Sequence, residues 1–196
     1  VSCENCCVKN HKDGSVTYYH QLLGASIVYP ENPIVIPLAP EPIVKSDGQN
    51  KNDCERNASK RLLNDVRREH PHLKLIILED SLASNGPHLR ELQSLDMRFI
   101  IGAKEGDHSF LFNWINSSDE VQNLEYKDIK GTTHKFRFLN SVPLNETNFD
   151  LKVNFIEYWQ IDSHQKVTHF TWVTDINLTT ENVEKIMRAG RTRWKI

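Results

Sequence analysis

The chain of 196 residues lacks any long hydrophobic run, and none approaches the about 20 apolar residues that a membrane-spanning helix requires. It also lacks an excess of one charge, because 24 Lys and Arg stand against 26 Asp and Glu, for a formal net charge of -2 at pH 7. A chain so balanced has no bulk attraction to nucleic acid, so such a contact would need a local basic patch. The hydrophobic fraction of 38% with 26% charged residues indicates a soluble globular protein without a membrane partner.

Cysteine is scarce, with four residues in the chain, three of them within the first seven positions. Without a secretory context we do not expect disulfides, so one interpretation is reduced thiols packed near a sheet edge. The other is a zinc site, because thiolate and imidazole suit the tetrahedral preference of zinc. A second C-x-x-C pair is missing, and both interpretations stay open. The candidate zinc ligands are Cys3, Cys6 and Cys54, with Cys7, His11 and His20 as further candidates.

Residues 73–80, Leu-Lys-Leu-Ile-Ile-Leu-Glu-Asp, form a short apolar run that ends in two carboxylates. The pattern predicts a strand buried on both faces, in the middle of a mixed or parallel sheet. Open α/β sheets have their active sites at the carboxyl ends of strands. Asp80 is therefore the first candidate for chemistry, and the alternative is that Glu79 and Asp80 merely end the strand.

The first half of the chain predicts strands that alternate with helices. The helix starts carry an N-cap residue with an acidic partner, or a proline in the first turn. This alternation fits an α/β layer fold with helices packed on a mixed sheet. In order, we expect a hairpin of strands 16–29 and 34–38, a helix that begins at Asn52 and is ended by 70–72, the strand 73–80, a helix from 84 to 95 and a buried strand 98–103.

From Lys104 to Asp175, polar turns separate short runs with high strand propensity. We expect this segment to be an all-β insertion whose last two runs form a long, aromatic-rich hairpin. Most of those aromatics should belong to the core of the insertion itself. The runs are 110–115, 134–139, 153–161 and 167–174, and the expected divisions are 1–104 for the first part of the α/β core, 105–175 for the insertion and 176–196 for the start of the last helix.

We expect the last helix to begin at Thr179 or Thr180. Although the chain as a whole is nearly neutral, this helix carries a local basic patch of Arg188, Arg191, Arg193 and Lys195. Arg193 lies near its inward stripe, so we expect it to face an acidic partner or a phosphate. Helical periodicity continues to Ile196 without a stop signal, and Val rather than Met stands first. We therefore expect an internal piece of a longer protein.

Five segments of the chain, taken together, carry a family resemblance. They are Glu-Asp-Ser-Leu at 79–82, Arg-Phe-Ile-Ile-Gly-Ala-Lys at 98–104, the β-rich insertion, Trp-Val-Thr-Asp at 172–175 and Arg-Thr-Arg-Trp-Lys-Ile at 191–196. These segments resemble bacterial insertion-sequence transposases of the DDE class, and residues 18–20 and 47–58 look like one branch of them. The resemblance spans nearly the whole chain. It implies a ribonuclease-H-like catalytic core with a β-strand insertion before the last helix.

By that resemblance, Asp80 matches the second catalytic aspartate of the family. The first aspartate would precede Val1, and the catalytic glutamate would directly follow Ile196, on the same helical face as Arg193. Arg193 matches the arginine of the family's Y-x2-R-x3-E signature. Gly190 stands where tyrosine is usual, which puts a tyrosine contact to DNA in doubt here.

The resemblance implies metal-dependent cleavage and joining of double-stranded DNA. Two Mg²⁺ ions roughly 3.5–4 Å apart would activate the nucleophile and stabilise the leaving oxygen, and Mg²⁺ prefers carboxylates and water as ligands. Asp80 would bind metal, while Arg193 would orient the glutamate or the scissile phosphate. The residues expected to hold the DNA backbone are Lys104, Arg188, Arg191 and Lys195.

The resemblance also implies a cytoplasmic bacterial protein that associates with the nucleoid and forms a homodimer at full length. Because two of the three metal-binding acids would lie outside the 196 residues, we expect this chain alone to be inactive. Two other interpretations stay open. One is a non-catalytic DNA-binding descendant of the same fold, and the other is a zinc-stabilised interaction module.

Overall fold

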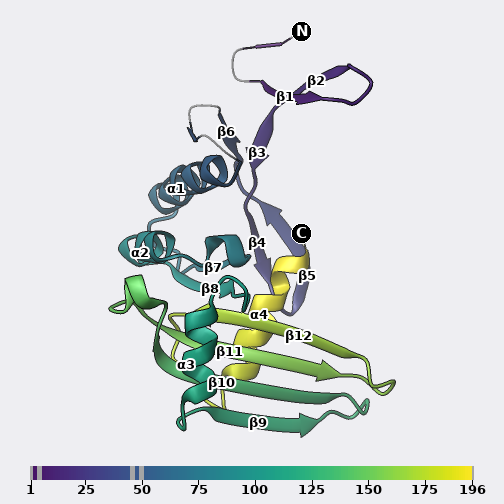
Figure 1. Ribbon diagram of the computed structural model, residues 1–196, viewed down its shortest axis with the longest axis vertical. Coiled ribbons are helices and arrows are strands. Elements are labelled where there is room, and N and C mark those ends of the chain that lie inside the picture. The colour runs from purple at the N-terminus through teal and green to yellow at the C-terminus, as the bar shows by residue number, and fades with distance from the viewer. Residues whose placement is uncertain (1, 4–5, 45–46, 49–50, 196) are drawn as a thin grey trace. The chain divides into compact units, whose positions relative to one another are not determined.

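The structure is a computed structural model in which the chain divides into two compact units (Figure 1). The N-terminal unit contains residues 1–28 and 34–73, and the sheet unit contains residues 29–33 and 74–195. The residues described are 2–3, 6–44, 47–48 and 51–195, without the side chains of 51–53 and 195. The cap predicted at Asn52 thus lies outside the described side chains.

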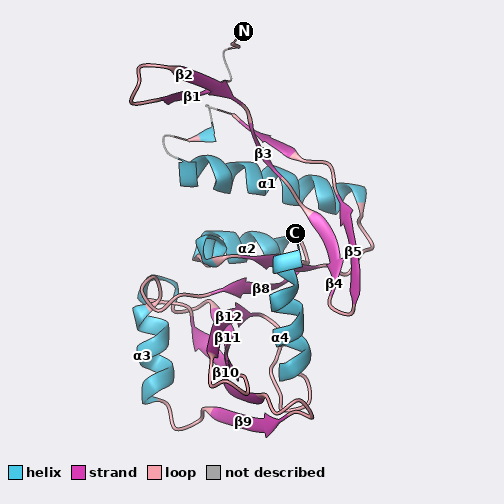
Figure 2. Cartoon of the chain, turned by 90° about the vertical axis from the view of Figure 1, so that its right-hand side faces the viewer, coloured by secondary structure: helices cyan, strands magenta, loops and turns pink. Residues whose placement is uncertain are grey.

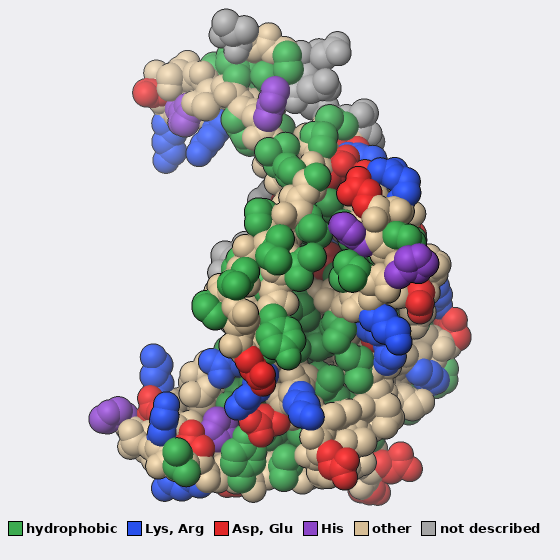
Figure 3. All heavy atoms as spheres, turned by 180° about the vertical axis from the view of Figure 1, so that it is seen from behind, with side chains coloured by type: hydrophobic (Ala, Val, Ile, Leu, Met, Phe, Trp, Pro, Cys, Tyr) green, Lys and Arg blue, Asp and Glu red, His purple; other side chains and the backbone are tan. Residues whose placement is uncertain are grey.

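Short two-stranded sheets make up most of the N-terminal unit. The run 16–29, predicted as one strand, is three strands with three different partners, and its last third alone forms the predicted hairpin. Most of these side chains are exposed, so no buried face holds the three pieces in one line (Figure 3). The pairs are β1 (Cys7–Asn10) with β2 (Val16–Tyr19), β3 (Gln21–Leu23) with β6 (Glu41–Ile43), and β4 (Ser26–Tyr29) with β5 (Asn32–Pro37).

Helix α1 (Lys51–Glu69) completes the N-terminal unit and buries an apolar stripe that includes Leu62 and Val66. On the same helix, Arg61 donates from Nη1 to Asp47 Oδ1 at 2.5 Å. Its Nε donates to Glu41 Oε1, also at 2.5 Å. The guanidinium lowers the pKa of Asp47 by hydrogen bonding to its carboxylate. These bonds tie the helix to the segment that precedes it.

Removing this arginine gives a pH-dependent prediction. We expect Arg61→Ala to lower the free energy of unfolding by about 1 kcal/mol at neutral pH, the upper end for ion pairs of exposed arginines. Because the folded pKa of Asp47 is depressed, the stabilisation is present above the unfolded pKa of about 3.9 and is lost as pH falls through the folded pKa. The difference from wild type should therefore shrink in acid.

Urea unfolding followed by circular dichroism, at neutral pH and below the folded pKa of Asp47, measures that difference. Arg68→Ala is the matched control, because its pair with Asp65 lies on side chains 69% and 43% exposed. We expect it to change stability by about 0.5 kcal/mol or less. A loss for Arg61→Ala that is equal at both pH values contradicts the prediction.

Six strands of the sheet unit form one mixed sheet in the order β7-β8-β12-β11-β10-β9. β7 and β8 are parallel, and the other neighbouring pairs are antiparallel. Figure 2 shows α3 and α4 on opposite faces of this sheet. The predicted α/β class, a mixed sheet flanked by helices, is confirmed. The strands are β7 (Ile76–Glu79), β8 (Arg98–Gly102), β9 (Gln122–Lys127), β10 (Thr133–Pro143), β11 (Lys152–Ile161) and β12 (Val167–Thr174).

Strand β7 lies at an edge of the sheet, because among the described strands it pairs with β8 alone. Its first residue, Ile76, is 46% exposed. The prediction of a central strand buried on both faces is therefore wrong. A run this short has the same apolar pattern at an edge as in the middle. The buried strand predicted next is confirmed, since Phe99, Ile100 and Ile101 of β8 are at most 1% exposed.

Helix α3 (Ser109–Ser117) occupies the position of the strand predicted at 110–115, so that prediction is wrong. Leu111, Phe112 and Ile115 are buried on one helical face, which shows that packing overrides the strand propensity of the run. The segment 105–175 is thus not all-β, and β9 to β12 belong to the same sheet as β7 and β8. The other helices are α2 (Gly86–Ser94) and α4 (Val183–Thr192), and the 3-10 turns are η2 (Ser81–Ala83), η3 (Glu146–Asn148) and η4 (Arg193–Lys195).

The predicted aromatic hairpin is present as β11 and β12, paired from Asn154 with Thr174 to Ile161 with Val167. Its aromatics mainly fill the core, where Tyr158 is fully buried and Trp172 is 5% exposed. Their predicted burial is confirmed, but the core is shared with β8 and α4 and does not belong to the segment 105–175 alone. Within the described parts of the chain, no helix combines the length and the apolar character needed to cross a membrane.

Candidate active site at the end of β7

Asp80 directly follows β7 and caps the short turn η2. Its backbone is extended, and its Oδ1 accepts a hydrogen bond from the backbone N–H of Leu82 at 3.0 Å. Aspartate is a favoured residue at this position because a short carboxylate satisfies the free amides of the first turn. Oδ1 of Asp80 therefore has a structural role at the end of the strand, as in the alternative interpretation that Asp80 merely ends β7. The side chain remains 55% exposed, and the second oxygen is available for another partner.

Gly102, the last residue of β8, allows the turn after β7 to pack closely against β8. A Cβ atom at Gly102 would lie 3.3 Å from the backbone nitrogen of Ser81 and 3.5 Å from the carbonyl carbon of Asp80. The first distance is tighter than most contacts of real Cβ atoms. Glycine thus fixes Asp80 beside the carboxyl end of the neighbouring parallel strand, where open α/β sheets carry their active sites.

The second oxygen of Asp80 contacts Arg193, which lies 113 positions later in the chain. Arg193 Nη2 donates to Asp80 Oδ2 at 2.9 Å. The Arg193 side chain is 31% exposed, and its guanidinium lies 5.0 Å from the ring centroid of Trp194. The acidic partner predicted for Arg193 is therefore Asp80. The contact joins the end of β7 to the end of α4 and brings the two candidate catalytic residues together.

Helix α4 approaches the sheet through Gly190. A Cβ atom there would lie 2.8 Å from Cε2 and 2.9 Å from Nε1 of Trp172, and 3.2 Å from Cγ2 of Ile100. Real Cβ atoms essentially never come closer than 3.0 Å to such neighbours. The departure from tyrosine noted in the sequence therefore has a steric reason, since no side chain fits between α4 and Trp172.

Of the two carboxylates that end β7, Glu79 already has a strong partner. His88 Nε2 lies 2.5 Å from Glu79 Oε2, and the His88 side chain is only 7% exposed. Sequence reasoning missed this histidine. A signal for it existed, because His88 follows the helix start predicted at 84–87. That start is confirmed by the backbone N–H of His88, which donates to the capping oxygen Asn85 Oδ1 at 3.1 Å. The pair leaves Asp80 as the acid that faces solvent.

The residues predicted to hold DNA differ in their surroundings. Lys104 is exposed just beyond β8, as Asp80 is just beyond β7. Arg188 forms an ion pair with Glu184 at 3.2 Å. Arg191 donates to Gln160 Oε1 at 2.7 Å and lies 5.2 Å from the ring centroid of Phe170. The side chain of Lys195 lies outside the described ones.

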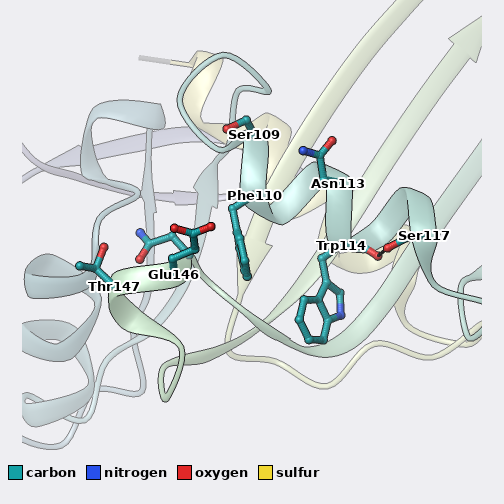
Figure 4. A pocket seen from close by; sticks show the side chains of 8 residues that line it. Ser109, Phe110, Asn113, Trp114, Ser117, Glu146 and Thr147 are labelled. Carbon is teal, nitrogen blue, oxygen red and sulfur yellow. Dashed lines mark hydrogen bonds between the residues drawn. The ribbon is translucent and has the colours of Figure 1, made fainter.

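Two cavities of the sheet unit lie apart from Asp80 and Arg193. The first, of about 560 Å³, runs between α3 and the turn η3, and Figure 4 shows Phe110 and Trp114 projecting from the same side of α3 into it. Its one charged residue is Glu146, which disfavours a phosphate ligand. The second, of about 450 Å³, includes both Arg188 and Arg191.

The residues predicted as zinc ligands are brought together only in part. Cys3, Cys6 and His20 form the one group, among the described residues, of three or more His, Cys, Asp or Glu side chains with a spacing suited to a metal. Cys54 is not a member, because it lies on α1 with its thiol 3.6 Å from the carbonyl oxygen of Gly48. The prediction that Cys54 joins Cys3 and Cys6 is therefore wrong.

The surroundings of Asp80 bear on the predicted magnesium site. Asp80 supplies a solvent-facing carboxylate of the kind that Mg²⁺ binds, but among the described residues it belongs to no group of three or more acids, histidines or cysteines with a spacing suited to a metal. One ligand of the expected site thus fits, and the others would have to come from beyond the described residues.

In comparisons with known proteins, no protein-family model matches the chain and no curated protein matches it.

Proposed function

We propose that the chain forms part of the catalytic core of a DDE-class DNA transposase, which cleaves and joins DNA strands with Mg²⁺. The observation that carries the proposal is the contact between Arg193 Nη2 and Asp80 Oδ2 at 2.9 Å. The family resemblance, which rests on five segments of the chain, assigns these two residues to one site. Their sequence positions are too far apart for local structure to bring them together.

The surroundings of Asp80 suit a metal ligand. Its carboxylate is half-exposed, it follows one of two parallel strands, and Gly102 and the amide of Leu82 fix its backbone and one oxygen. When bound, two Mg²⁺ ions would activate a water or a DNA 3′-hydroxyl and stabilise the leaving oxygen. Asp80 would hold one ion in place, because an anionic carboxylate on a fixed backbone is a preorganised hard ligand.

Arg193 has a separate task in this proposal. A guanidinium carries five N–H donors in a planar fork, so it keeps one on Asp80 and offers others to a phosphate oxygen. The resemblance expects the catalytic glutamate four positions after Arg193, so that both would serve the same site. Lys104, Arg188, Arg191 and Lys195 would hold the backbone of double-stranded DNA without reading its sequence.

The sheet is compatible with a ribonuclease-H-like core, and the resemblance alone adds that the protein is a homodimeric, nucleoid-associated bacterial one. The parallel pair β7 and β8 carries the candidate acid, and the antiparallel strands that follow return to β8 through β12 before α4 begins. Such an order agrees with strands inserted between the last core strand and the last helix. A non-catalytic DNA-binding descendant has the same fold, so activity must separate the two.

Arg193→Ala tests the proposal in the protein expressed from its whole gene, with a plasmid that carries the gene and its flanking DNA as substrate. We expect Mg²⁺-dependent strand cleavage to fall by about 100-fold or more, as when one charge-stabilising donor is lost. Stability should change by less than about 1 kcal/mol, because the pair is exposed. Gel analysis of nicked and joined products, beside thermal melting, measures both.

Arg193→Lys should recover part of the activity, because lysine keeps the charge but not the fork. Arg68→Ala, which also removes an arginine from an exposed ion pair, should leave cleavage unchanged. The 196 residues alone should be inactive, because one carboxylate does not make a two-metal site. Full-length protein that binds this DNA without cleaving it, at any Mg²⁺ concentration, overturns the proposal in favour of the non-catalytic descendant.

A further inference from the structure

Two thiols and an imidazole converge at one end of the β1–β2 hairpin. Cys3 Sγ lies 3.5 Å from Cys6 Sγ and 3.2 Å from His20 Nε2, and Cys6 Sγ lies 3.4 Å from the same nitrogen. A tetrahedral zinc ion with Zn–S of about 2.3 Å and Zn–N of about 2.0 Å has S···S edges of about 3.8 Å and S···N edges of about 3.5 Å. The observed triangle differs from one face of that tetrahedron by a few tenths of an ångström.

The register of the hairpin explains why these three residues meet. Cys7 pairs with Tyr19, so the preceding residue of one strand and the following residue of the other, Cys6 and His20, lie side by side just beyond the last pair. The amide of Cys6 donates to the carbonyl of Cys3 at 3.2 Å, a turn that folds Cys3 back. Each ligand is therefore positioned by backbone structure and not by its own flexibility.

A backbone amide also orients one of the thiols. The N–H of Cys3 points at Cys6 Sγ, 3.2 Å away. A hydrogen bond of this kind holds the sulfur in the orientation of a metal ligand. Cys6 is 7% exposed, whereas every residue of β2 is exposed. The least exposed side chain of the hairpin is thus a soft metal ligand.

The hairpin has little else to stabilise it. Val8, Val16 and Tyr18 are 46–50% exposed, so its apolar side chains bury little area. An isolated two-stranded hairpin is marginally stable in water at best. A metal that joins the residues flanking its open end would supply binding free energy directly to the folded state.

We propose that Cys3, Cys6 and His20 bind a zinc ion that crosslinks the open end of the β1–β2 hairpin. Two thiolates and one imidazole select zinc over Mg²⁺, which takes oxygen ligands. Cys3 and His20 are exposed, so water reaches the fourth corner. The site belongs to the N-terminal unit and does not rest on the function proposed for Asp80.

The test is a zinc titration of the purified 196-residue chain, kept under reducing conditions, in competition with a chromogenic chelator. We expect one zinc per chain and the release of thiol protons on binding. With Co²⁺ in place of zinc, intense visible bands and a sulfur-to-metal charge-transfer band should report tetrahedral coordination by thiolates. Zinc affinity should fall by more than about 100-fold in Cys3→Ser, Cys6→Ser and His20→Ala, a larger loss than for outer partners of a metal site.

Three variants serve as matched controls. Cys7→Ser removes the adjacent thiol, which points at Gln21 Oε1 3.8 Å away, Cys54→Ser removes the thiol on α1, and His11→Ala removes an imidazole bonded to Thr17 Oγ1. All three should keep wild-type affinity. His20→Cys should also keep zinc, as a three-thiolate site, which separates loss of a ligand from loss of folding.

Several results would overturn the proposal. One is a wild-type chain that retains no zinc at micromolar concentration although its circular dichroism shows a folded, helix-containing protein. Another is zinc that survives Cys6→Ser but is lost in Cys54→Ser. A third is a Cys3–Cys6 disulfide that forms under mildly reducing conditions in the presence of zinc, which would make the pair a redox couple instead. DNA cleavage is not among the readouts, so this test and that of the transposase proposal fail independently.

Discussion

Asp80→Asn should abolish Mg²⁺-dependent DNA cleavage by the full-length protein, with a rate at least about 1000-fold below wild type, since loss of a metal ligand exceeds the 10- to 100-fold typical of outer partners. The substitution removes the charge that binds the ion and leaves the shape of the side chain. Its amide oxygen still caps η2 through the Leu82 N–H, because asparagine caps as well as aspartate. The fold should therefore survive the loss of activity.

Two measurements separate a catalytic role of Asp80 from a structural one. Thermal melting of Asp80→Asn should lie close to wild type, since the lost ion pair with Arg193 is exposed and worth about 1 kcal/mol or less. The matched control is Asp119→Asn, which removes an exposed carboxylate from the loop after α3 and should cleave DNA like wild type. Wild-type cleavage by Asp80→Asn would refute the assignment of this acid.

Gly190→Tyr, which restores the residue usual in the family signature, should destabilise the sheet unit by more than about 3 kcal/mol, the upper range for overpacking. The reason is the 2.8 Å between a Cβ at this position and Cε2 of Trp172. Gly190→Ala should cost about 1–3 kcal/mol by the same clash, in part offset by the roughly 1 kcal/mol that alanine gains over glycine in a helix. Urea unfolding followed by tryptophan fluorescence measures both.

Gly106→Tyr is the control for that series, because a Cβ at Gly106 has nothing within 4 Å and the backbone there is not left-handed. It should change stability by about 0.5 kcal/mol at most. Adding Trp172→Ala to Gly190→Ala should relieve the clash, so the two changes should be clearly non-additive. A Gly190→Tyr protein as stable as wild type would mean that α4 does not pack on β12 as described.

The elements that sequence reasoning found correctly have a strong local pattern. Helix α2 has a proline in its first turn followed by leucines at helical spacing, and β8 has a dense apolar run, of which Phe99, Ile100 and Ile101 are buried. The errors fall where a single signal is ambiguous. The aromatic run 110–115 suits a strand or a buried helix face equally well. It forms a helix because Leu111, Phe112 and Ile115 can then pack together against the core. The edge position of β7 depends on neighbours that its own residues do not encode.

For the candidate sites, sequence supplied the residue types and the structure supplied the pairing. The pattern of the last helix predicted an acidic partner or a phosphate for Arg193. That the partner is Asp80, 113 positions earlier, follows only from the fold of the residues between them. The cysteine pattern could not separate His20 from Cys54 as a third ligand, because both are distant in sequence. The register of β1 with β2 makes that choice.

The glycine contact between α4 and Trp172 has a consequence for Arg193. With no side chain of its own at Gly190, α4 packs directly against the side chains of Trp172 and Ile100, which limits how far it can shift on the sheet. Arg193 follows Gly190 by three residues, about 4.5 Å along a helix axis. The contact of Gly190 with Trp172 therefore also sets the position of the Arg193 guanidinium. Trp172 stands on β12 and Asp80 follows β7, with β8 between them. Asp80 and Arg193 are thus both positioned by the same sheet. We expect a small change at Trp172 to alter the contact between the Arg193 guanidinium and the Asp80 carboxylate.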